Sequence, residues 1–199
     1  MIRLIFGAVL SAAVLFAWGF VFWAASGIMY QFIHRLPNED EVSQALQKTD
    51  PDSGTYRIPF PDPAAMSGAD KDKEAALKTQ NLKGPLVEII YRKEGLDPTR
   101  PQEYAVGFCH LLAASLLAGM LLILSQPGLP RYWMRVAFVT LAGVFATVAV
   151  SFAEPVWFHH PWAAVLYTSA YQVIGWLLAG LVLGLVIRPA KEETGTKTA

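Results

Sequence analysis

Residues 164–187 read AVLYTSAYQVIGWLLAGLVLGLVI, and no Asp, Glu, Lys or Arg interrupts them. An α-helix needs about 20 predominantly apolar residues to cross the roughly 30 Å of bilayer hydrocarbon, and this stretch is long enough. Pro161 precedes it and Pro189 follows it, which is where prolines are tolerated around a helix. The sequence therefore predicts a membrane-spanning helix over residues 164–187.

Three other windows share this apolar character, and together they predict four crossings. A first helix is expected within residues 1–26, and further helices are expected at 105–125 and 134–153. The predicted remainder is an extracytoplasmic segment at 27–104, an outer turn at 154–163 and a cytoplasmic tail at 188–199.

The composition agrees with a chain that uses lipid as part of its solvent. Hydrophobic residues make up 54% of the chain and charged residues only 16%, against about 25% charged in a typical soluble domain. Most of the charges fall between Arg35 and Glu103. We therefore expect an α-helical integral membrane protein with four transmembrane helices. A small α+β extracytoplasmic lobe is expected between the first and second helices.

The first window has a second interpretation, as a cleavable signal peptide. Arg3 precedes the apolar run, and the small residues Ala24 and Ser26 lie near its end. The run is longer than a usual signal-peptide core, and it contains Trp18 and Trp23. These features favour a retained helix and leave cleavage as the alternative.

The orientation follows from the basic residues in the short flanks of the helices, because Lys and Arg are enriched on the cytoplasmic side. The turn at 154–163 has no Lys or Arg and contains Glu154. The flanks at the other helix ends carry Arg3, Arg131, Arg135, Arg188 and Lys191. Both termini are therefore predicted to be cytoplasmic. Residues 27–104 are then periplasmic, in the inner membrane of a bacterium.

The polar segment between the first two helices is patterned enough to predict a small α+β lobe. Asn38 and Glu41 are spaced as in a capping box, which predicts a helix that ends at the turn beginning with Asp50. Residues 55–58 and 86–91 are predicted strands, and residues 70–81 a charged surface helix. Residues 60–68 are expected to form an extended loop, because prolines recur there.

Several short motifs resemble a known group of proteins. They are Leu36-Pro37-Asn38-Glu39, Tyr56, Gly84-Pro85-Leu86 with Tyr91, and the run from Gln172 to Gly180. With these motifs the chain resembles an uncharacterised family of bacterial four-helix inner-membrane proteins over most of its length. That family has no assigned activity, so the resemblance implies fold and location only.

Four histidines and one glutamate are predicted to lie at the same, outer depth of the membrane: His34, His110, Glu154, His159 and His160. Imidazole and carboxylate groups at one depth could bind zinc or copper. The alternative is that these residues anchor helix ends, because no His-x-x-x-His spacing is present. A bis-histidine haem would need two helical histidines, and only His110 falls clearly inside a predicted helix.

The outer half of the last helix is unusually polar. Tyr167 and Tyr171 are spaced to share one helix face, and Gln172 is the deepest strongly polar residue. The predicted role of Gln172 is an interhelical hydrogen bond. The alternative is that these three residues form the wall of a small cavity for a lipid or quinone headgroup.

Small residues recur at the four-residue spacing that lets membrane helices approach closely. The pairs are Gly7 with Ser11, Ser115 with Gly119, and Gly180 with Gly184. Packing within the bundle is the first interpretation, and a docking face for another subunit is the second.

The function that these observations favour is non-catalytic. No predicted transmembrane helix has an internal Asp, Glu, Lys or Arg, and no nucleotide-binding, nucleophile-elbow or zinc-protease motif occurs. The single cysteine, Cys109, excludes multi-cysteine metal centres, and the net charge of zero gives no basic surface for nucleic acid. We expect an accessory or assembly subunit that binds lipid and other membrane proteins, or a second copy of itself, and that requires no cofactor. The alternative is a membrane protein that binds a metal, haem or a lipid-like or quinone ligand.

Overall fold

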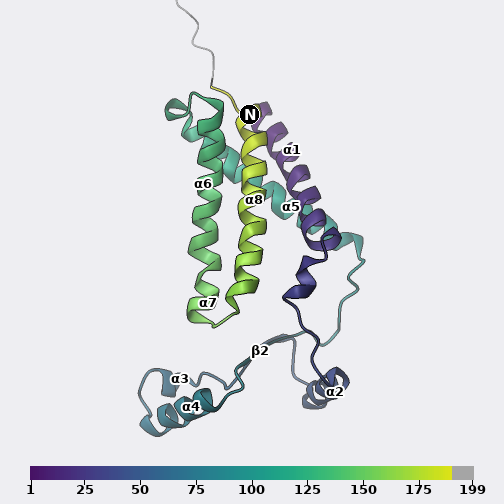
Figure 1. The fold of residues 1–199 in the computed structure, drawn as a ribbon, viewed down its shortest axis with the longest axis vertical. Helices are drawn as coiled ribbons and strands as arrows, with labels where there is room; N and C mark the ends of the chain where they lie inside the picture. Colours follow the sequence, from purple (N-terminus) through teal and green to yellow (C-terminus); the bar gives the residue numbers. More distant parts are fainter. Residues whose placement is uncertain (190–199) are drawn as a thin grey trace, which may run out of the picture. The chain divides into compact units, whose positions relative to one another are not determined.

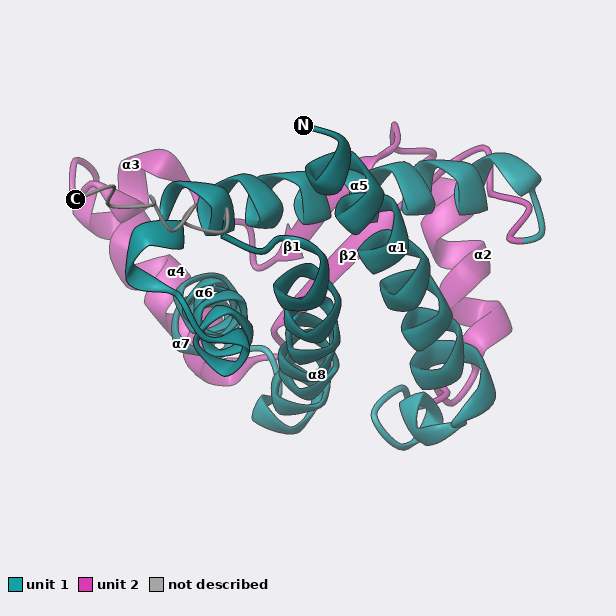
Figure 2. Cartoon of the chain, turned by 90° about the horizontal axis from the view of Figure 1, so that it is seen from above, with its two compact units in different colours: residues 1–34, 99–199 teal, residues 35–98 magenta. Residues whose placement is uncertain are grey.

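The computed structural model describes residues 1–189, so the predicted tail lies outside the described residues from position 190 onward. The chain divides into two compact units (Figure 2). One contains residues 1–34 and the chain from Thr99 onward, and the other, called the lobe below, is Arg35–Pro98. The lobe is therefore an insertion between the first and second long helices.

The first unit is helical throughout (Figure 1). Helix α1, Ile2–Gly19, continues into a π-helical turn, η1, Phe20–Ala25, and a 3₁₀ turn, η2, Ile28–Gln31. The remaining elements are α5 Pro101–Leu124, η3 Gln126–Gly128, α6 Tyr132–Ser151, α7 Ala153–Trp157 and α8 Trp162–Val186.

Four helical segments are long and apolar enough to cross a membrane, as the sequence predicts. They are Ile2–Ala25, Pro101–Leu124, Tyr132–Trp157 and Trp162–Val186. Helix α5 starts four residues before the expected window, because Pro101 occupies its first turn, where a missing N–H is harmless. Part of the expected outer turn is helical, since α7 follows α6 almost directly.

Helix α8 lies between α6 and α1, and α1 also contacts α5. Figure 2 shows α6 and α8 along their axes and α5 from the side, so α5 crosses the other helices at a steep angle. Leu122, Val139, Leu183 and Ile187 from α5, α6 and the end of α8 form the buried cluster of this unit. Leu4, Leu129 and Trp176 pack around this cluster.

The lobe contains two strands, as predicted, and three helices. Its elements are α2 Glu39–Thr49, β1 Gly54–Ile58, α3 Pro63–Met66, α4 Lys71–Lys83 and β2 Val87–Tyr91. The strands pair antiparallel, with Gly54 opposite Tyr91 and Ile58 opposite Val87. Two-stranded sheets are marginally stable alone, so the lobe depends on additional contacts.

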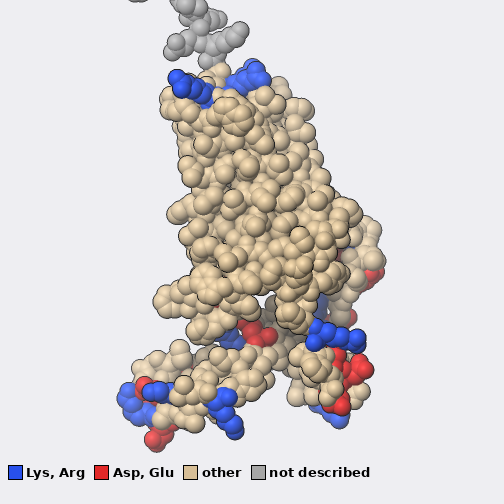
Figure 3. Space-filling model, in the orientation of Figure 1, with Lys and Arg blue, Asp and Glu red and all other residues tan. Residues whose placement is uncertain are grey.

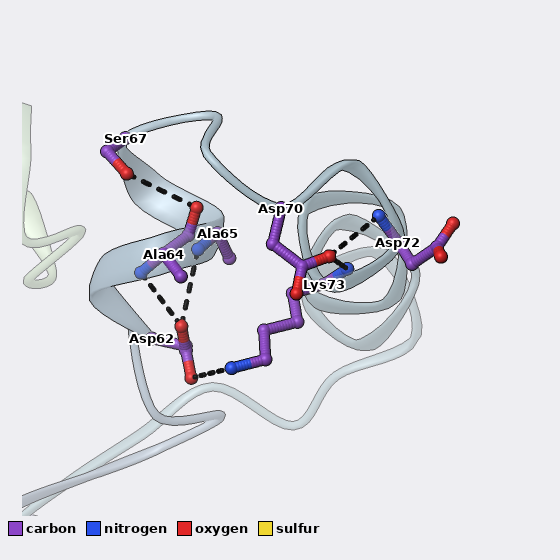
Figure 4. A network of polar contacts seen from close by, with 7 residues as sticks. All are labelled: Asp62, Ala64, Ala65, Ser67, Asp70, Asp72 and Lys73. Atoms are coloured by element: carbon purple, nitrogen blue, oxygen red, sulfur yellow. Dashed lines mark hydrogen bonds and ion pairs between the residues drawn. The ribbon is translucent and has the colours of Figure 1, made fainter.

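Two aspartates hold α3 and α4 together (Figure 4). Asp62 accepts hydrogen bonds from the backbone N–H groups of Ala64 and Ala65 at 2.9 and 3.3 Å, and it forms an ion pair with Lys73 at 3.3 Å. Asp70 caps α4 through the N–H groups of Asp72 and Lys73. The expectation of an extended loop at 60–68 is therefore wrong, because Asp62 and Pro63 together start a short helix.

The expected capping box at the start of α2 does not form. Asn38 has a left-handed backbone, with φ of 58°, and its side chain makes no capping hydrogen bond. The helix nonetheless begins at Glu39, since three acidic residues in its first turn interact favourably with the helix dipole. Its last residue is Thr49, next to the predicted turn at Asp50.

Candidate functional site

The lobe has almost no hydrophobic core of its own. Within residues 35–98, Ala65 is the only hydrophobic residue that is fully buried. Large apolar side chains are exposed instead, among them Phe60 at 67%, Met66 at 69% and Leu82 at 80% of their surface. A folded domain normally gains its stability by burying such groups, so the lobe presents surface that another molecule can cover.

The sheet of the lobe has one apolar face. The strand register places Tyr56 opposite Ile89 and Ile58 opposite Val87. Because side chains alternate along a strand, these four residues share a face with Tyr91. Tyr56, Ile58 and Val87 remain 38%, 53% and 37% exposed. We call Tyr56, Ile58, Val87, Ile89 and Tyr91 the apolar sheet face.

The opposite face of the sheet contains Thr55, Arg57 and Glu88 and one apolar residue, Ile90, which is 86% exposed. Arg57 lies opposite Glu88, and the two form an ion pair at 3.3 Å. With only two strands, each strand also has one edge along which no other strand of the sheet lies. The apolar sheet face and these two edges together form a surface that could accept a protein strand or helix.

Polar contacts close the ladder near Gly54 and Tyr91. The Ser53 hydroxyl donates to Glu94 and accepts from the Lys93 N–H, both at 3.0 Å, and Lys93 forms an ion pair with Asp50 at 2.6 Å. Hydrogen bonding to Asp50 raises the pKa of Lys93. Hydrogen bonds from its own backbone N–H and from Ser53 lower the pKa of Glu94. These contacts fix the register of the strands and therefore the composition of the apolar sheet face.

The predicted histidine shell is not assembled into a metal site within residues 1–189. No three His, Cys, Asp or Glu side chains in this range are close enough to hold one ion. The structure brings together His160 and Glu154, with 3.1 Å between Nδ1 and Oε2. His34, His110 and His159 are exposed, and His110 alone lies within a helix, α5.

Tyr167 and Tyr171 pack into an aromatic cluster beside the π-helical turn. The ring of Tyr167 stacks on Phe22 and Phe32, with centroids 4.5 and 4.8 Å apart. Tyr171 contacts Trp18, Phe22 and Trp23. Both tyrosine rings thus pack against aromatic side chains from residues 18–32.

The π-helical turn supplies the polar partners of this cluster. In this turn the N–H of Ser26 bonds Val21 instead of Phe22. The carbonyl of Phe22 is therefore free to accept hydrogen bonds from the Ser26 and Tyr167 hydroxyls. The sequence does not predict this turn, because residues 20–25 are as apolar as the helix before them.

Gln172 faces α6 and not the aromatic cluster. The Ser151 hydroxyl donates to Gln172 Oε1 at 3.3 Å, which is an interhelical hydrogen bond. On the same helix, Ser169 is only 7% exposed, and its hydroxyl is buried with no hydrogen-bond partner among the described residues. Helix α8 therefore carries one buried hydroxyl that the described residues leave without a hydrogen bond.

The six predicted small residues are all used in contacts within the bundle. Gly180 and Gly184 lie against Val136 of α6, and Gly7 lies against Val186 of α8. Ser115 donates to Ser11 at 3.2 Å, and both side chains are fully buried. Gly119 packs against Leu4 and Ile187. These positions hold the four helices together, so none remains as a free docking face.

Arg135 has a structural role that its place in the sequence does not indicate. Its side chain is 5% exposed and donates to three backbone carbonyls, those of Leu129, Pro130 and Gly184, at 3.1, 2.8 and 3.0 Å. Gly184 lies in the last turn of α8, where carbonyl groups have no helical partner. Arg135 therefore ties the start of α6 to the end of α8.

Comparison of the chain with protein-family models, with curated proteins and with solved structures found no match. The resemblance to a bacterial inner-membrane family therefore remains a prediction.

Proposed function

We propose that this chain is a non-catalytic accessory or assembly subunit of a membrane. Its four long helices lie in the bilayer, and its lobe binds another membrane protein on the outer side. In this proposal the membrane is the bacterial inner membrane, both termini are cytoplasmic, and the lobe is periplasmic. The observation that carries the proposal is the lobe itself, which exposes an apolar sheet face and buries only Ala65 among its hydrophobic residues.

The small-residue pairs do not contribute to this proposal, because the bundle already uses them. Support comes instead from the exposed area of the lobe and from the two open sheet edges. A partner that covers the apolar sheet face gains hydrophobic stabilisation of roughly 25 cal/mol for each Å² of apolar surface removed from water. An added strand would also satisfy the backbone groups of one edge.

The proposed topology is tested by cysteine labelling. After Cys109→Ala, single cysteines are introduced as Lys48→Cys in the lobe and Gly128→Cys in the turn before α6. A membrane-impermeant maleimide added to intact cells should label the first, and should label the second only after permeabilisation. The reverse pattern would invert the topology, and equal labelling in a washed soluble fraction would exclude membrane insertion.

The partner is tested by photocrosslinking from the sheet in native membranes. A photoreactive phenylalanine analogue replaces Tyr56 or Tyr91 on the apolar sheet face, or Ile90 on the opposite face as the control. The apolar positions should form one protein adduct of defined mass, and that protein should co-purify in stoichiometric amount in mild detergent. Equal adducts from both faces, or a solitary monomer without adducts, would contradict the proposal.

One observation favours the alternative, a binding protein for a lipid-like or quinone ligand. The unpaired Ser169 hydroxyl lies on α8 with Gln172, and the amide of Gln172 bonds Ser151 of α6. A ligand carbonyl could accept a hydrogen bond from Ser169. Organic extraction of the purified protein, followed by mass spectrometry of the extract, tests whether a stoichiometric quinone or lipid is bound there.

A further inference from the structure

Among the described residues of the four-helix unit, the two glutamates lie away from every arginine except Arg100, the N-cap of α5. These two acidic residues are Glu103, in the first turn of α5, and Glu154, in α7. The arginines at the start of α1, the start of α6 and the end of α8 are at the other end of the bundle. The face drawn in Figure 3 shows blue side chains there with no red beside them.

Three exposed arginines lie close in sequence to residues of one hydrophobic cluster. Leu4, Leu129 and Ile187 all belong to or pack against the cluster around Leu122. Arg3 and Arg188 are their direct neighbours in sequence, and Arg131 is two residues from Leu129. We call Arg3, Arg131 and Arg188 the arginine end.

Two segments of the arginine end, those leading to Arg131 and Arg188, are held in place by polar contacts. Arg135 joins the carbonyls of Leu129 and Pro130 to that of Gly184. Gln126 donates to the carbonyl of Arg188 at 3.4 Å. The segment before Arg131 and the segment before Arg188 are therefore fixed to one another by Arg135, whose own charge is committed to the protein.

The three exposed guanidinium groups have no carboxylate to neutralise them within residues 1–189. Neither acidic residue of the four-helix unit is at this end. The sequence beyond Pro189 adds Lys191, Glu192, Glu193 and Lys197, so its formal charges cancel. The arginine end therefore carries an uncompensated positive charge.

We propose that the arginine end binds the phosphate groups of anionic phospholipids in the leaflet that it faces. This inference rests on the proposed membrane insertion. Guanidinium groups match phosphate oxygens in a two-pronged geometry that lysine cannot reproduce. Trp133, 68% exposed and two residues from Arg131, is of the type that lies at headgroup level. Each basic residue near an anionic leaflet contributes about fivefold to affinity.

The test is a lipid titration of the full chain in neutral detergent, followed by native mass spectrometry. Phosphatidylglycerol should bind more tightly than phosphatidylcholine. The triple variant Arg3→Gln, Arg131→Gln, Arg188→Gln should lose at least about tenfold of the phosphatidylglycerol affinity. The control variant Lys48→Gln, Lys78→Gln, Lys83→Gln removes the same charge from the lobe and should bind as the parent does.

Two further experiments separate the contribution of charge from loss of folding, and lipid binding from the binding of free phosphate. Replacing the three arginines by lysine keeps the charge without the two-pronged geometry, so it should restore only part of the binding that the glutamine variant loses. Inorganic phosphate in large excess should leave lipid binding intact, whereas full competition would show an ordinary phosphate site. Equal affinity for both lipids, or an unchanged triple variant, overturns the proposal. If the lipid test fails in this way while cysteine labelling still shows membrane insertion, the lipid-binding inference is wrong and the proposed topology stands.

Discussion

Trp176 of α8 packs directly over Gly143 of α6, where a Cβ atom would overlap the Cβ and Cγ atoms of the tryptophan. Those tryptophan atoms lie next to the α8 backbone and cannot swing away. The two helices therefore approach as closely as they do because residue 143 has no side chain. This contact is the centre of the most extensive helix pair in the molecule.

Gly143→Ala should destabilise the bundle, because the added methyl group forces α6 and α8 apart. Overpacking of this kind costs about 1–3 kcal/mol. The midpoint of unfolding in a sodium dodecyl sulfate titration measures the loss. Gly107→Ala in α5 is the matched control, since nothing lies within 4 Å of a Cβ atom there. It should be neutral or stabilising, and equal losses at the two sites would contradict the packing argument.

Arg135→Met should be strongly destabilising, because three carbonyl groups lose their shared donor. We expect a loss of roughly 3 kcal/mol in the same titration. Arg135→Lys should recover only part of it, since an ammonium group cannot reproduce the planar fork of guanidinium. Arg131→Met removes an exposed arginine four residues earlier and should change stability by less than about 0.5 kcal/mol.

Two serines in similar apolar surroundings should behave differently. Ser115→Ala removes the donor to the fully buried Ser11, so we expect a loss of about 0.5–1.5 kcal/mol. Ser169→Ala removes a buried hydroxyl that has no partner among the described residues, so stability should stay constant or rise. A clear loss from Ser169→Ala would show that this hydroxyl is bonded to water or ligand in the membrane.

The helical pair α3–α4 should loosen in acid. Hydrogen bonding to the Ala65 N–H, together with Lys73, lowers the pKa of Asp62 from its usual 3.8. A carboxyl group whose pKa is lower in the folded state stabilises that state fully above its unfolded pKa. That stabilisation is lost as the pH falls through the folded value. NMR amide signals of Ala64 and Ala65 should titrate with a midpoint below 3.8.

The matched control for this titration is Asp72→Asn. Asp72 points away from both capped helix starts in Figure 4 and should leave the Ala64 and Ala65 titration unchanged. Asp62→Asn should abolish it. A midpoint above 3.8 in the parent chain would contradict the capping role of Asp62.

The sequence predicts the four long helices well, because the length and apolar composition that a helix needs to cross a bilayer can be recognised directly in a sequence. A crossing helix must stay uncharged for about 20 residues, and this requirement is visible without any knowledge of packing. The two strands were also predictable, since β-branched and aromatic residues at 86–91 are bounded by Gly84 and Pro85. The start of α5 moved by only a few residues, to Pro101, whereas the short helix after Asp62 replaces the loop that was predicted there.

The sequence did not predict features that depend on distant residues. In the sequence, Arg135 is one of several arginines in the flanks of the long helices, and only the fold shows that α8 brings the carbonyl of Gly184 to it. The spacing of Asn38 and Glu41 suits a capping box, yet the left-handed backbone at Asn38 prevents it. Tyr167 and Tyr171 share a helix face as predicted, but aromatic rings from residues 18–32 fill the space in front of them.

The lobe is inserted between α1 and α5, and these two helices touch at the buried hydroxyl pair Ser11 and Ser115. A mechanical load applied to the lobe therefore reaches the bundle through two connecting segments at once, one leading to α1 and one to α5. Helix α6 would receive that load mainly by way of α8, its principal neighbour. The lobe is thus mechanically coupled first to α1 and α5 and last to α6, which Arg135 ties to α8.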